Sequence, residues 1–141
     1  MTKSFISFNP ATEEKLIEYP GHSLNEVNDK LDKSVRAQKQ WKNYSFVERG
    51  RALKHIARTL RKRKKDYSFL ITEEMGKPIT ESLAEIEKCA WTCEHFAQNA
   101  EKYLQPMYVK TEAKKSYVSY EPLGTILGIM PWNFPFWQFF R

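Results

Sequence analysis

The amino-acid sequence predicts an α/β protein, and two observations support this fold class. Three segments place apolar residues at the three- and four-residue spacing of amphipathic helices. Residues Thr125–Met130 (TILGIM) are instead apolar on both faces, as in a parallel strand covered by helices on each side. A parallel strand reaches its neighbours through connections of a dozen or more residues, and eleven residues follow Met130. We therefore expect the 141 residues to be the front part of a larger α/β protein.

Composition favours a folded cytoplasmic protein. Apolar residues make up 41% of the chain and charged residues 28%, as in ordinary soluble domains. The longest apolar run is far shorter than the roughly 20 residues that a membrane span requires, and the first residues lack the apolar core of a secretion signal. Cys89 and Cys93 are too few for a secreted disulfide scaffold. We expect no membrane partner.

Two short strands are expected first. Ser4–Phe8 alternates apolar and polar residues and is broken by an Asn-Pro pair, and Lys15–Tyr19 is ended by a Pro-Gly pair. A turn should join them.

Two helices then begin at capping boxes, in which a serine hydroxyl accepts from a helical amide and a glutamate reaches back to the cap. The box Ser23–Glu26 starts the first helix, whose apolar stripe is Val27, Leu31, Val35 and Trp41. The box Ser45–Glu48 starts the second helix, whose expected inner face is Leu53, Ile56, Leu60, Tyr67, Leu70 and Ile71. Gly76 should end the second helix, and Pro78 prevents its continuation.

A third helix is expected over Ile79–Leu104. Its stripe forms a narrow seam for another helix or sheet and consists of Leu83, Ile86, Ala90, Cys93, Ala97, Ala100 and Leu104. The period then changes to two, so Ser116–Tyr120 is predicted to be a half-buried strand. The turn Glu121–Gly124 leads from it into Thr125–Met130.

A run of basic residues supplies much of the net charge of +6. Six of the eight residues in Arg58–Lys65 are Arg or Lys, which could attract nucleic acid. Apolar positions keep helical phase on both sides of the run, and no aromatic interleaving accompanies it. We favour a solvated helix face and expect no nucleic-acid partner; a small basic helical nucleic-acid-binding module is the alternative.

Cys89, Cys93 and His95 lie close together in the sequence, and a metal or redox site is one interpretation. Cys93 already belongs to the apolar stripe, and His95 lies elsewhere on the helical wheel. We favour packing, in which a free cysteine behaves as a small hydrophobe, and we expect no metal.

The stretch Pro131–Pro135 (PWNFP) follows the apolar run and should start a helix with Pro135 in its first turn. Open α/β sheets bind ligands just beyond the carboxyl ends of their strands. Each proline restricts the residue before it, so Asn133 is held at a stiff corner. Its amide can donate to an oxygen that becomes negative in a transition state, or it can simply cap the helix. Spacing leaves both open.

A helix starting at Phe134 would place Phe134, Gln138 and Arg141 on one face, beside Asn133. That face would combine an aromatic wall, an amide and a guanidinium. Arginine grips carboxylates through two parallel hydrogen bonds. The other interpretation of Arg141 is a charge that only aids solubility.

The sequence resembles the N-terminal part of an NAD(P)-dependent aldehyde dehydrogenase along essentially its whole length. The resemblance rests on Asn9–Thr12 (NPAT), Glu74–Pro78 (EMGKP), Glu121–Gly124 (EPLG) and, most specifically, Pro131–Pro135. The extended motif PWNFPFWQ is similar to the succinate-semialdehyde dehydrogenase branch. The resemblance implies short N-terminal strands, three long helices, an oligomerisation strand near 107–120 and the first strand of a Rossmann-like cofactor domain. Residues 1–141 would then be an incomplete N-terminal part of the cofactor-binding domain.

The resemblance also implies roles for the matching residues. Asn133 would be the catalytic side-chain donor to the oxyanion. The cofactor, NAD or NADP, would be bordered by Ile129, Met130, Pro131, Trp132 and Asn133. The substrate tunnel would be lined by Phe134, Gln138 and Arg141. Arg141 would hold the distal carboxylate of a small aldehyde such as succinate semialdehyde.

In the family reaction a cysteine thiolate attacks the aldehyde, hydride passes to NAD(P), and a carboxylate activates water to hydrolyse the thioester. The nucleophilic cysteine, the base, the glycine-bearing cofactor loop and the adenosine-binding lysine belong to later segments of the family. Cys89 and Cys93 match neither the position nor the context of the nucleophile. We therefore expect the parent protein, a homodimer or homotetramer, to oxidise succinate semialdehyde to succinate, and this chain alone not to. Docking of the chain onto intact copies through Tyr117–Tyr120 is a further alternative.

Overall fold

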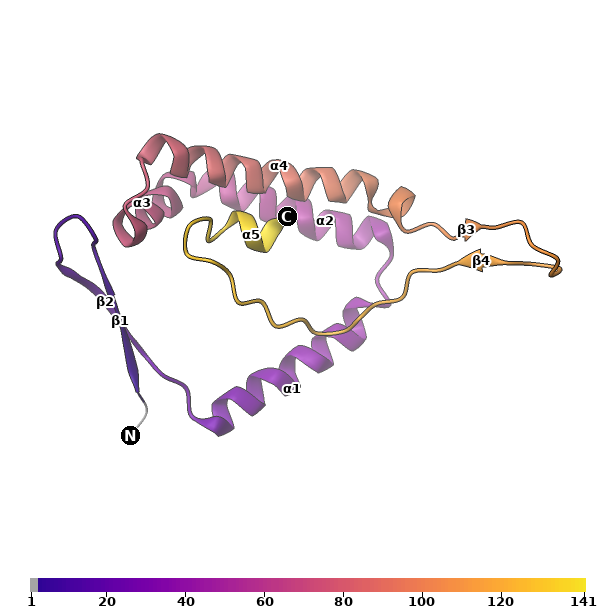
Figure 1. Cartoon of the computed structure of the whole chain (residues 1–141), viewed down its shortest axis with the longest axis horizontal. Coiled ribbons are helices and arrows are strands. Elements are labelled where there is room, and N and C mark those ends of the chain that lie inside the picture. Colours follow the sequence, from indigo (N-terminus) through magenta and orange to yellow (C-terminus); the bar gives the residue numbers. More distant parts are fainter. Residues whose placement is uncertain (1–2) are drawn as a thin grey trace.

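The computed structural model describes residues 3–141 and consists of a helical bundle with two separate β-hairpins (Figure 1). Its helices are α1 (Leu24–Trp41), α2 (Phe46–Lys62), α3 (Lys64–Met75), α4 (Ile79–Tyr103) and the short α5 (Trp137–Phe140). Its strands are β1 (Ser4–Phe8), β2 (Lys15–Pro20), β3 (Met107–Tyr108) and β4 (Tyr117–Val118). Within the described part of the chain, no helix is long and apolar enough to cross a membrane.

Capping boxes start α1 and α2, as the sequence predicts. The side chain of Ser23 accepts from the amide of Glu26, whose carboxylate accepts from the amide of Ser23. Ser45 and Glu48 form the same reciprocal pair at α2. These hydrogen bonds satisfy amide groups that a helix start otherwise leaves without partners. Both predicted helix starts are therefore confirmed.

The core lies where α2 and α3 pack along α4 (Figure 1). Its buried apolar side chains come from all three helices: Ala57, Leu60, Ile71, Ile86, Cys89, Ala90 and Cys93. Gly50 of α2 approaches α4 so closely that an added Cβ would lie 3.0 Å from the carbonyl oxygen of Ala97. The α4 seam predicted from the sequence is thus confirmed at its centre, whereas Leu104 at its end is exposed.

The prediction of one continuous helix from Ser45 to Gly76 is wrong. The helix breaks at Arg63, whose φ and ψ are −104° and 21°. Because of this break α3 changes direction and packs on α4, which buries Ser68 and Ile71, while Leu70 and Ile56 stay exposed. Gly76 ends α3 in the left-handed conformation expected of a helix-terminating glycine.

The N-terminal strands are confirmed as an antiparallel hairpin, with Ser4 opposite Pro20 and Phe5 opposite Tyr19. Gly21 continues this pairing by donating its amide to the carbonyl of Lys3 at 2.9 Å. An added Cβ at Gly21 would lie 2.2 Å from the same carbonyl oxygen. Only glycine fits at this point without displacing the backbone.

The strand predicted over Ser116–Tyr120 is shorter than expected, because only Tyr117 and Val118 pair with β3. The strand predicted over Thr125–Met130 does not form. Residues 119–130 follow an irregular path, and Leu123 and Ile129 are 92% and 87% exposed. A strand needs a neighbour to satisfy its backbone, and none lies beside this segment in residues 3–141. The segment instead passes α1, where Ser34 donates to the hydroxyl of Thr125 at 3.2 Å (Figure 1).

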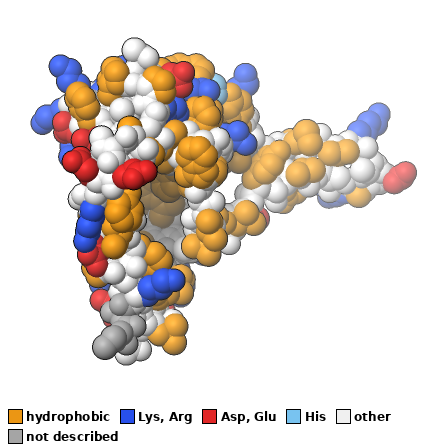
Figure 2. All heavy atoms as spheres, turned by 60° about the vertical axis from the view of Figure 1, so that its left-hand side comes forward, with side chains coloured by type: hydrophobic (Ala, Val, Ile, Leu, Met, Phe, Trp, Pro, Cys, Tyr) orange, Lys and Arg blue, Asp and Glu red, His pale blue; other side chains and the backbone are white. Residues whose placement is uncertain are grey.

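Helix α1 lies apart from the bundle, and none of Leu24–Trp41 is buried (Figure 1). Its apolar stripe of Val27, Leu31, Val35 and Trp41 is 39–52% exposed. The face of the molecule in Figure 2 is hollowed, with hydrophobic side chains around the hollow.

Candidate functional site

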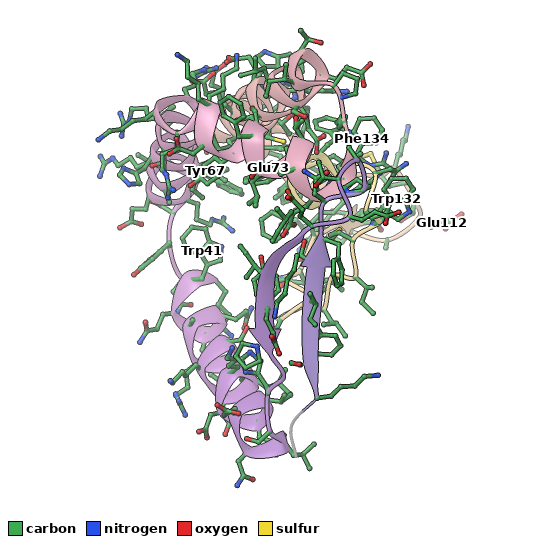
Figure 3. The ribbon with its side chains drawn as sticks, turned by 90° about the vertical axis from the view of Figure 1, so that its left-hand side faces the viewer. Trp41, Tyr67, Glu73, Glu112, Trp132 and Phe134 are labelled. Atoms are coloured by element: carbon green, nitrogen blue, oxygen red, sulfur yellow. The ribbon has the colours of Figure 1, made fainter. Side chains whose placement is uncertain are left out.

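The segment 131–141 folds back onto α4, which forms the base of the candidate site. Phe136, Trp137 and Phe140 pack against the core, and the rings of Phe136 and Tyr67 lie 5.4 Å apart. The helix predicted from Phe134 begins only at Trp137, because a turn precedes it in which the amide of Gln138 donates to the carbonyl of Phe134 at 3.1 Å. Figure 3 shows Trp132 and Phe134 at the end of the bundle that also carries Glu73.

A buried ion pair joins this segment to the helices. Nζ of Lys77 lies 2.5 Å from a carboxylate oxygen of Glu85, and the two side chains are 5% and 2% exposed. The other oxygen of Glu85 accepts from the amides of Phe136 and Trp137, both at 3.0 Å. Nζ of Lys77 also donates to the carbonyl of Asn133 at 3.3 Å and lies 3.7 Å from the ring centre of Phe134. The corner between Asn133 and Trp137 is thus held by two charged side chains.

A pocket of about 400 Å³ lies beside this pair, within the range typical of small-molecule sites. Its lining consists of Lys77, Glu81, Ala84, Glu85, Lys88, Phe134, Trp137, Gln138 and Arg141. The structure therefore brings together Phe134, Gln138 and Arg141, the three residues that the sequence groups on one face. Their role in binding substrate stays a prediction.

Two cations border the pocket, and unlike Lys77 neither of them makes an ion pair within residues 3–141. Arg141 is exposed at its wall, and Lys88 reaches in from α4 with Nζ 3.9 Å from the ring centre of Trp137. A cation over an aromatic face is attracted by the ring while it keeps its charge. The pocket consequently combines aromatic walls with two positive groups and the carboxylate of Glu81.

Asn133 lies at the corner but does not line the pocket. The interpretation of Asn133 as a helix cap is wrong, because the N-cap position of α5 is Phe136 and the carboxylate of Glu85 accepts the amides there. The Asn133 side chain is exposed and makes no hydrogen bond within residues 3–141. Its role as an oxyanion donor stays a prediction.

The residues predicted to border a cofactor do not form an enclosed site. Ile129 and Trp132 are 87% and 75% exposed, and Met130 is likewise exposed. Trp132 lines a second pocket of about 190 Å³ with Leu70, Ile71, Glu74, Met75, Pro135 and Phe136. Segment 129–133 thus offers one exposed, largely apolar edge. The sequence has no glycine-rich loop that could cradle phosphates, and the role of this edge in binding a cofactor stays a prediction.

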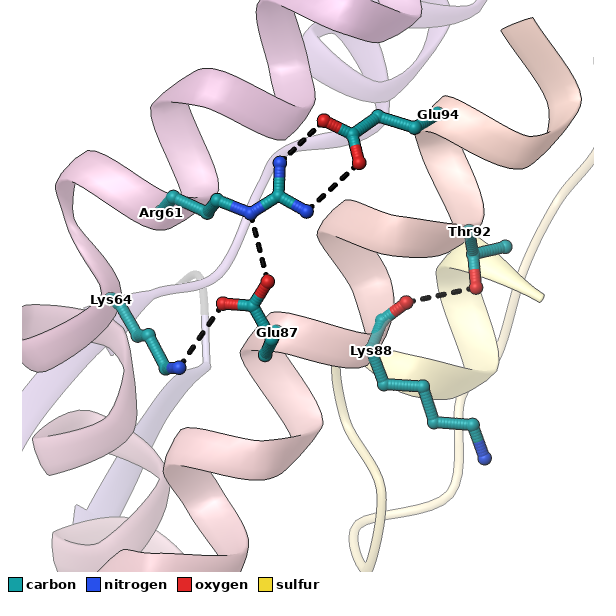
Figure 4. A network of polar contacts seen from close by, with 6 residues as sticks. All are labelled: Arg61, Lys64, Glu87, Lys88, Thr92 and Glu94. Carbon is teal, nitrogen blue, oxygen red and sulfur yellow. Dashed lines mark hydrogen bonds and ion pairs between the residues drawn. The ribbon is translucent and has the colours of Figure 1, made fainter. Parts of the chain in front are cut away.

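Two of the six basic residues of the run, Arg61 and Lys64, take part in a polar network between α2, α3 and α4 (Figure 4). Arg61 grips both carboxylate oxygens of Glu94 and also donates from Nε to Glu87 at 2.8 Å. Lys64 donates to the other oxygen of Glu87 at 3.1 Å. Hydrogen bonds from Arg61 hold the pKa values of Glu87 and Glu94 below their ordinary range, with Lys64 adding to the effect at Glu87. With Arg63, which pairs with Asp66 at 3.2 Å, three of the six basic residues of the run make ion pairs within residues 3–141.

The cysteines lie in the core, as predicted. Cys89 and Cys93 are 0% and 2% exposed, and burial raises the pKa of the Cys89 thiol to about 12. His95 is engaged elsewhere, since its Nε2 lies 2.9 Å from the hydroxyl of Tyr103. Residues 3–141 contain no group of three metal-ligating side chains. Neither thiol is placed to act as a nucleophile, because thiolate formation is strongly suppressed.

Comparison with known proteins identifies the family of this chain. The sequence profile described as the aldehyde dehydrogenase family matches residues 1–141. The chain belongs to the aldehyde dehydrogenase family. The α/β fold class predicted for its N-terminal portion is confirmed by the solved structures that it resembles.

Two curated relatives carry names from the succinate-semialdehyde branch. A probable succinate-semialdehyde dehydrogenase (NADP+) of Synechocystis is 43% identical over 98% of this chain and 30% of its own length. The succinate semialdehyde dehydrogenase Sad of Escherichia coli K12 is 37% identical over 96% of this chain and 29% of its own length. The chain therefore spans about 30% of the length of these relatives.

Among solved structures, succinic semialdehyde dehydrogenase from Streptococcus pyogenes, with NADP+ as its cofactor, aligns with a TM-score of 0.90. It is 28% identical, and the alignment covers 96% of this chain and 30% of that one. The fold of this chain thus follows about 30% of the length of that enzyme.

Sequence reasoning missed the pair of Lys77 and Glu85. The sequence pattern assigns no role to either residue. A signal exists, because Ser82, Glu85 and Cys89 form a row at three- and four-residue spacing next to the apolar seam of α4. An acid in such a row is close to the core and needs a partner when it is buried.

Proposed function

We propose that these residues belong to an enzyme that oxidises succinate semialdehyde to succinate with NAD or NADP. The observation that carries the proposal is the pocket in which Phe134, Gln138 and Arg141 meet, next to the corner that presents Asn133. The names of the relatives support the same substrate.

Recognition of the substrate would come from Arg141, with Lys88 as a nearby second cation. A succinate semialdehyde molecule is a short chain with a carboxylate at one end and an aldehyde at the other. Arg141 can hold the carboxylate through two parallel hydrogen bonds. The rings of Phe134 and Trp137 supply apolar walls for the carbon chain between the two ends.

Asn133 would stabilise the aldehyde oxygen as it becomes negative. Its exposed side chain carries an NH2 group whose hydrogen bonds are not engaged within residues 3–141. A fixed donor of this kind contributes about 3–4 kcal/mol to transition-state stabilisation. Its backbone carbonyl is held by Lys77, so the side chain starts from a fixed position.

NAD or NADP, when bound, supplies the acceptor for the hydride. The exposed edge formed by Ile129, Met130, Pro131, Trp132 and Asn133 would border its nicotinamide and ribose. The buried thiols of Cys89 and Cys93 cannot attack an aldehyde at neutral pH. We therefore propose that the nucleophile lies outside these 141 residues and that the chain by itself turns over no aldehyde.

A chimera tests this function. In the Synechocystis relative, the region shared with this chain is replaced by these 141 residues, and formation of reduced cofactor from succinate semialdehyde is followed. We expect the chimera to be active and the separate 141-residue chain to be inactive. An inactive chimera that folds and binds NADP+, or turnover by the separate chain, would contradict the proposal.

We further propose that the parent protein is a homodimer or homotetramer with β3 and β4 at an interface. The hairpin projects away from the bundle (Figure 1), and Tyr108 and Tyr117 are 68% and 52% exposed with their rings 5.9 Å apart. Sedimentation of the chimera with and without Tyr117→Lys tests this. The substituted protein should dissociate, and an unchanged mass would exclude the hairpin as an interface.

A further inference from the structure

We infer that Lys77 and Glu85 are positioning residues for the reaction, a buried ion pair that fixes the backbone of residues 133–137 and so aims the side chain of Asn133. This inference rests on the proposed function for its catalytic consequence. Its structural part stands on the contacts alone.

Glu85 holds the end of the corner that leads into α5. One of its oxygens accepts from two consecutive amides, those of Phe136 and Trp137, each at 3.0 Å. These amides begin α5, a helix of four residues whose own N-cap side chain, Phe136, has no acceptor. A carboxylate that accepts backbone amides makes hydrogen bonds roughly twice as strong as neutral ones. Glu85 on α4 therefore defines where α5 begins.

Lys77 holds the beginning of the corner, at Asn133. Its ammonium group has three donors, and two of them meet Glu85 at 2.5 Å and the carbonyl of Asn133 at 3.3 Å. The same group lies 3.7 Å from the ring centre of Phe134. The peptide after Asn133 is thus fixed through its carbonyl, and the direction of the Asn133 side chain depends on that peptide.

The pair is better explained by geometry than by stability. Burying two charges costs free energy that their attraction only partly returns, and apolar replacements of similar volume are often neutral or stabilising. Here the pair links three separate parts of the chain: the turn after α3, the interior of α4 and the corner at 133–137. Such a linkage fixes one orientation among these parts, which a reaction at Asn133 requires and which folding of the bundle does not.

The structural part is tested on the 141-residue chain by amide nuclear magnetic resonance. In the unsubstituted chain, the amide protons of Phe136 and Trp137 should lie downfield and exchange slowly, because both donate to a carboxylate. Glu85→Ala should move both signals upfield and speed their exchange. Glu101→Ala is the matched control, because Glu101 is an exposed acid on the same helix. Unmoved signals in Glu85→Ala would overturn the inference.

The catalytic part is tested in the chimera. Lys77→Met and Glu85→Gln should each lower kcat for succinate semialdehyde by about tenfold or more, since small misplacements of a reacting group are costly. KM should change by less than about threefold, because the carboxylate grip at Arg141 remains. The double variant should be little worse than either single one, and Lys77→Arg should recover part of the loss. Glu101→Gln should match the unsubstituted chimera.

These outcomes separate a positioning role from a structural one. If the variants keep kcat within about twofold per folded enzyme while their amide signals move, the pair is only structural and the inference fails. If Lys77→Met or Glu85→Ala loses its helical circular dichroism, the charge-conserving Lys77→Arg and the size-conserving Glu85→Gln decide. An inactive unsubstituted chimera would instead contradict the proposed function, and the amide measurements would still test the pair.

Discussion

Arg61 of α2 forms a two-pronged ion pair with Glu94 of α4, so the basic run of the sequence is tied to the acidic side of the longest helix (Figure 4). Glu87 extends this arrangement by bridging Arg61 and Lys64. The network spans the break between α2 and α3, because Arg61 belongs to α2 and Lys64 to α3. Its side chains are about one-third to nearly one-half exposed, so water and salt weaken it.

We predict a pH-dependent contribution of this network to stability. The pKa values of Glu87 and Glu94 are lowered in the folded chain, mainly by Arg61. Their contribution is therefore complete above the ordinary glutamate pKa of about 4.3 and is lost as the pH falls through the lowered values. Arg61→Met should lower the melting temperature at pH 7, and this difference should vanish in acid and shrink in about 1 M salt.

Arg58→Met provides the control for that measurement, because Arg58 is an exposed cation of the same run. It should alter the melting temperature less than Arg61→Met does. Equal effects of the two substitutions at every pH would show that general charge repulsion, and not the network, governs the stability of this region.

The buried thiols should be unreactive in the folded chain. Burial raises the pKa of Cys89 to about 12 and also raises that of Cys93. Alkylation by iodoacetamide at pH 8 should therefore be at least about a hundredfold slower in the native protein than in denaturant, because only the thiolate reacts. Rapid modification of either cysteine under native conditions would contradict the assignment of both to the core.

The close approach of α2 to α4 depends on Gly50. Gly50→Ala would place a methyl group 3.0 Å from the carbonyl oxygen of Ala97, so the two helices would have to separate. Overpacking of this kind costs about 1–3 kcal/mol. Urea unfolding should show a matching loss in Gly50→Ala. A change below about 0.5 kcal/mol would mean that the helices separate freely.

The centre of the bundle is Ile86, which is fully buried on α4. Ile86→Ala removes three carbons from a packed site and should destabilise the chain by about 2–5 kcal/mol, whereas Ile86→Val should cost about 0.5–1.5 kcal/mol. Val47→Ala at an exposed position of α2 should cost much less. Similar losses at the two positions would argue against a core centred on α4.

Local sequence determined the parts of the fold that are stabilised locally. The boxes Ser23–Glu26 and Ser45–Glu48 fix two helix starts by contacts three residues apart, and Gly76 ends α3 by its own backbone conformation. The break at Arg63 could not be predicted, because the helical spacing of apolar residues continues on both sides of it and neither glycine nor proline marks it. Thr125–Met130 has the composition of a buried strand, but strand formation requires neighbours that a local pattern does not describe.

The candidate site, like the fold, could be predicted only in part from the sequence. Spacing grouped Phe134, Gln138 and Arg141, and the structure places them at one pocket although α5 begins later than predicted. Lys77 and Glu85 were missed because their importance comes from residues more than 50 positions away in the sequence. Helical periodicity predicts which face of one helix is buried. It does not reveal which residues of a distant segment pack against that face.

The central claim, that Arg141 selects an aldehyde with a distal carboxylate, is tested most directly by a specificity ratio. In the chimera, kcat/KM is measured for succinate semialdehyde and for butyraldehyde, which lacks the carboxylate, before and after Arg141→Met. A charge-assisted pair contributes about 1.5–3 kcal/mol, so the ratio should fall by roughly tenfold to a hundredfold, with butyraldehyde little affected. An unchanged ratio, or an equal loss for both aldehydes, would contradict the claim.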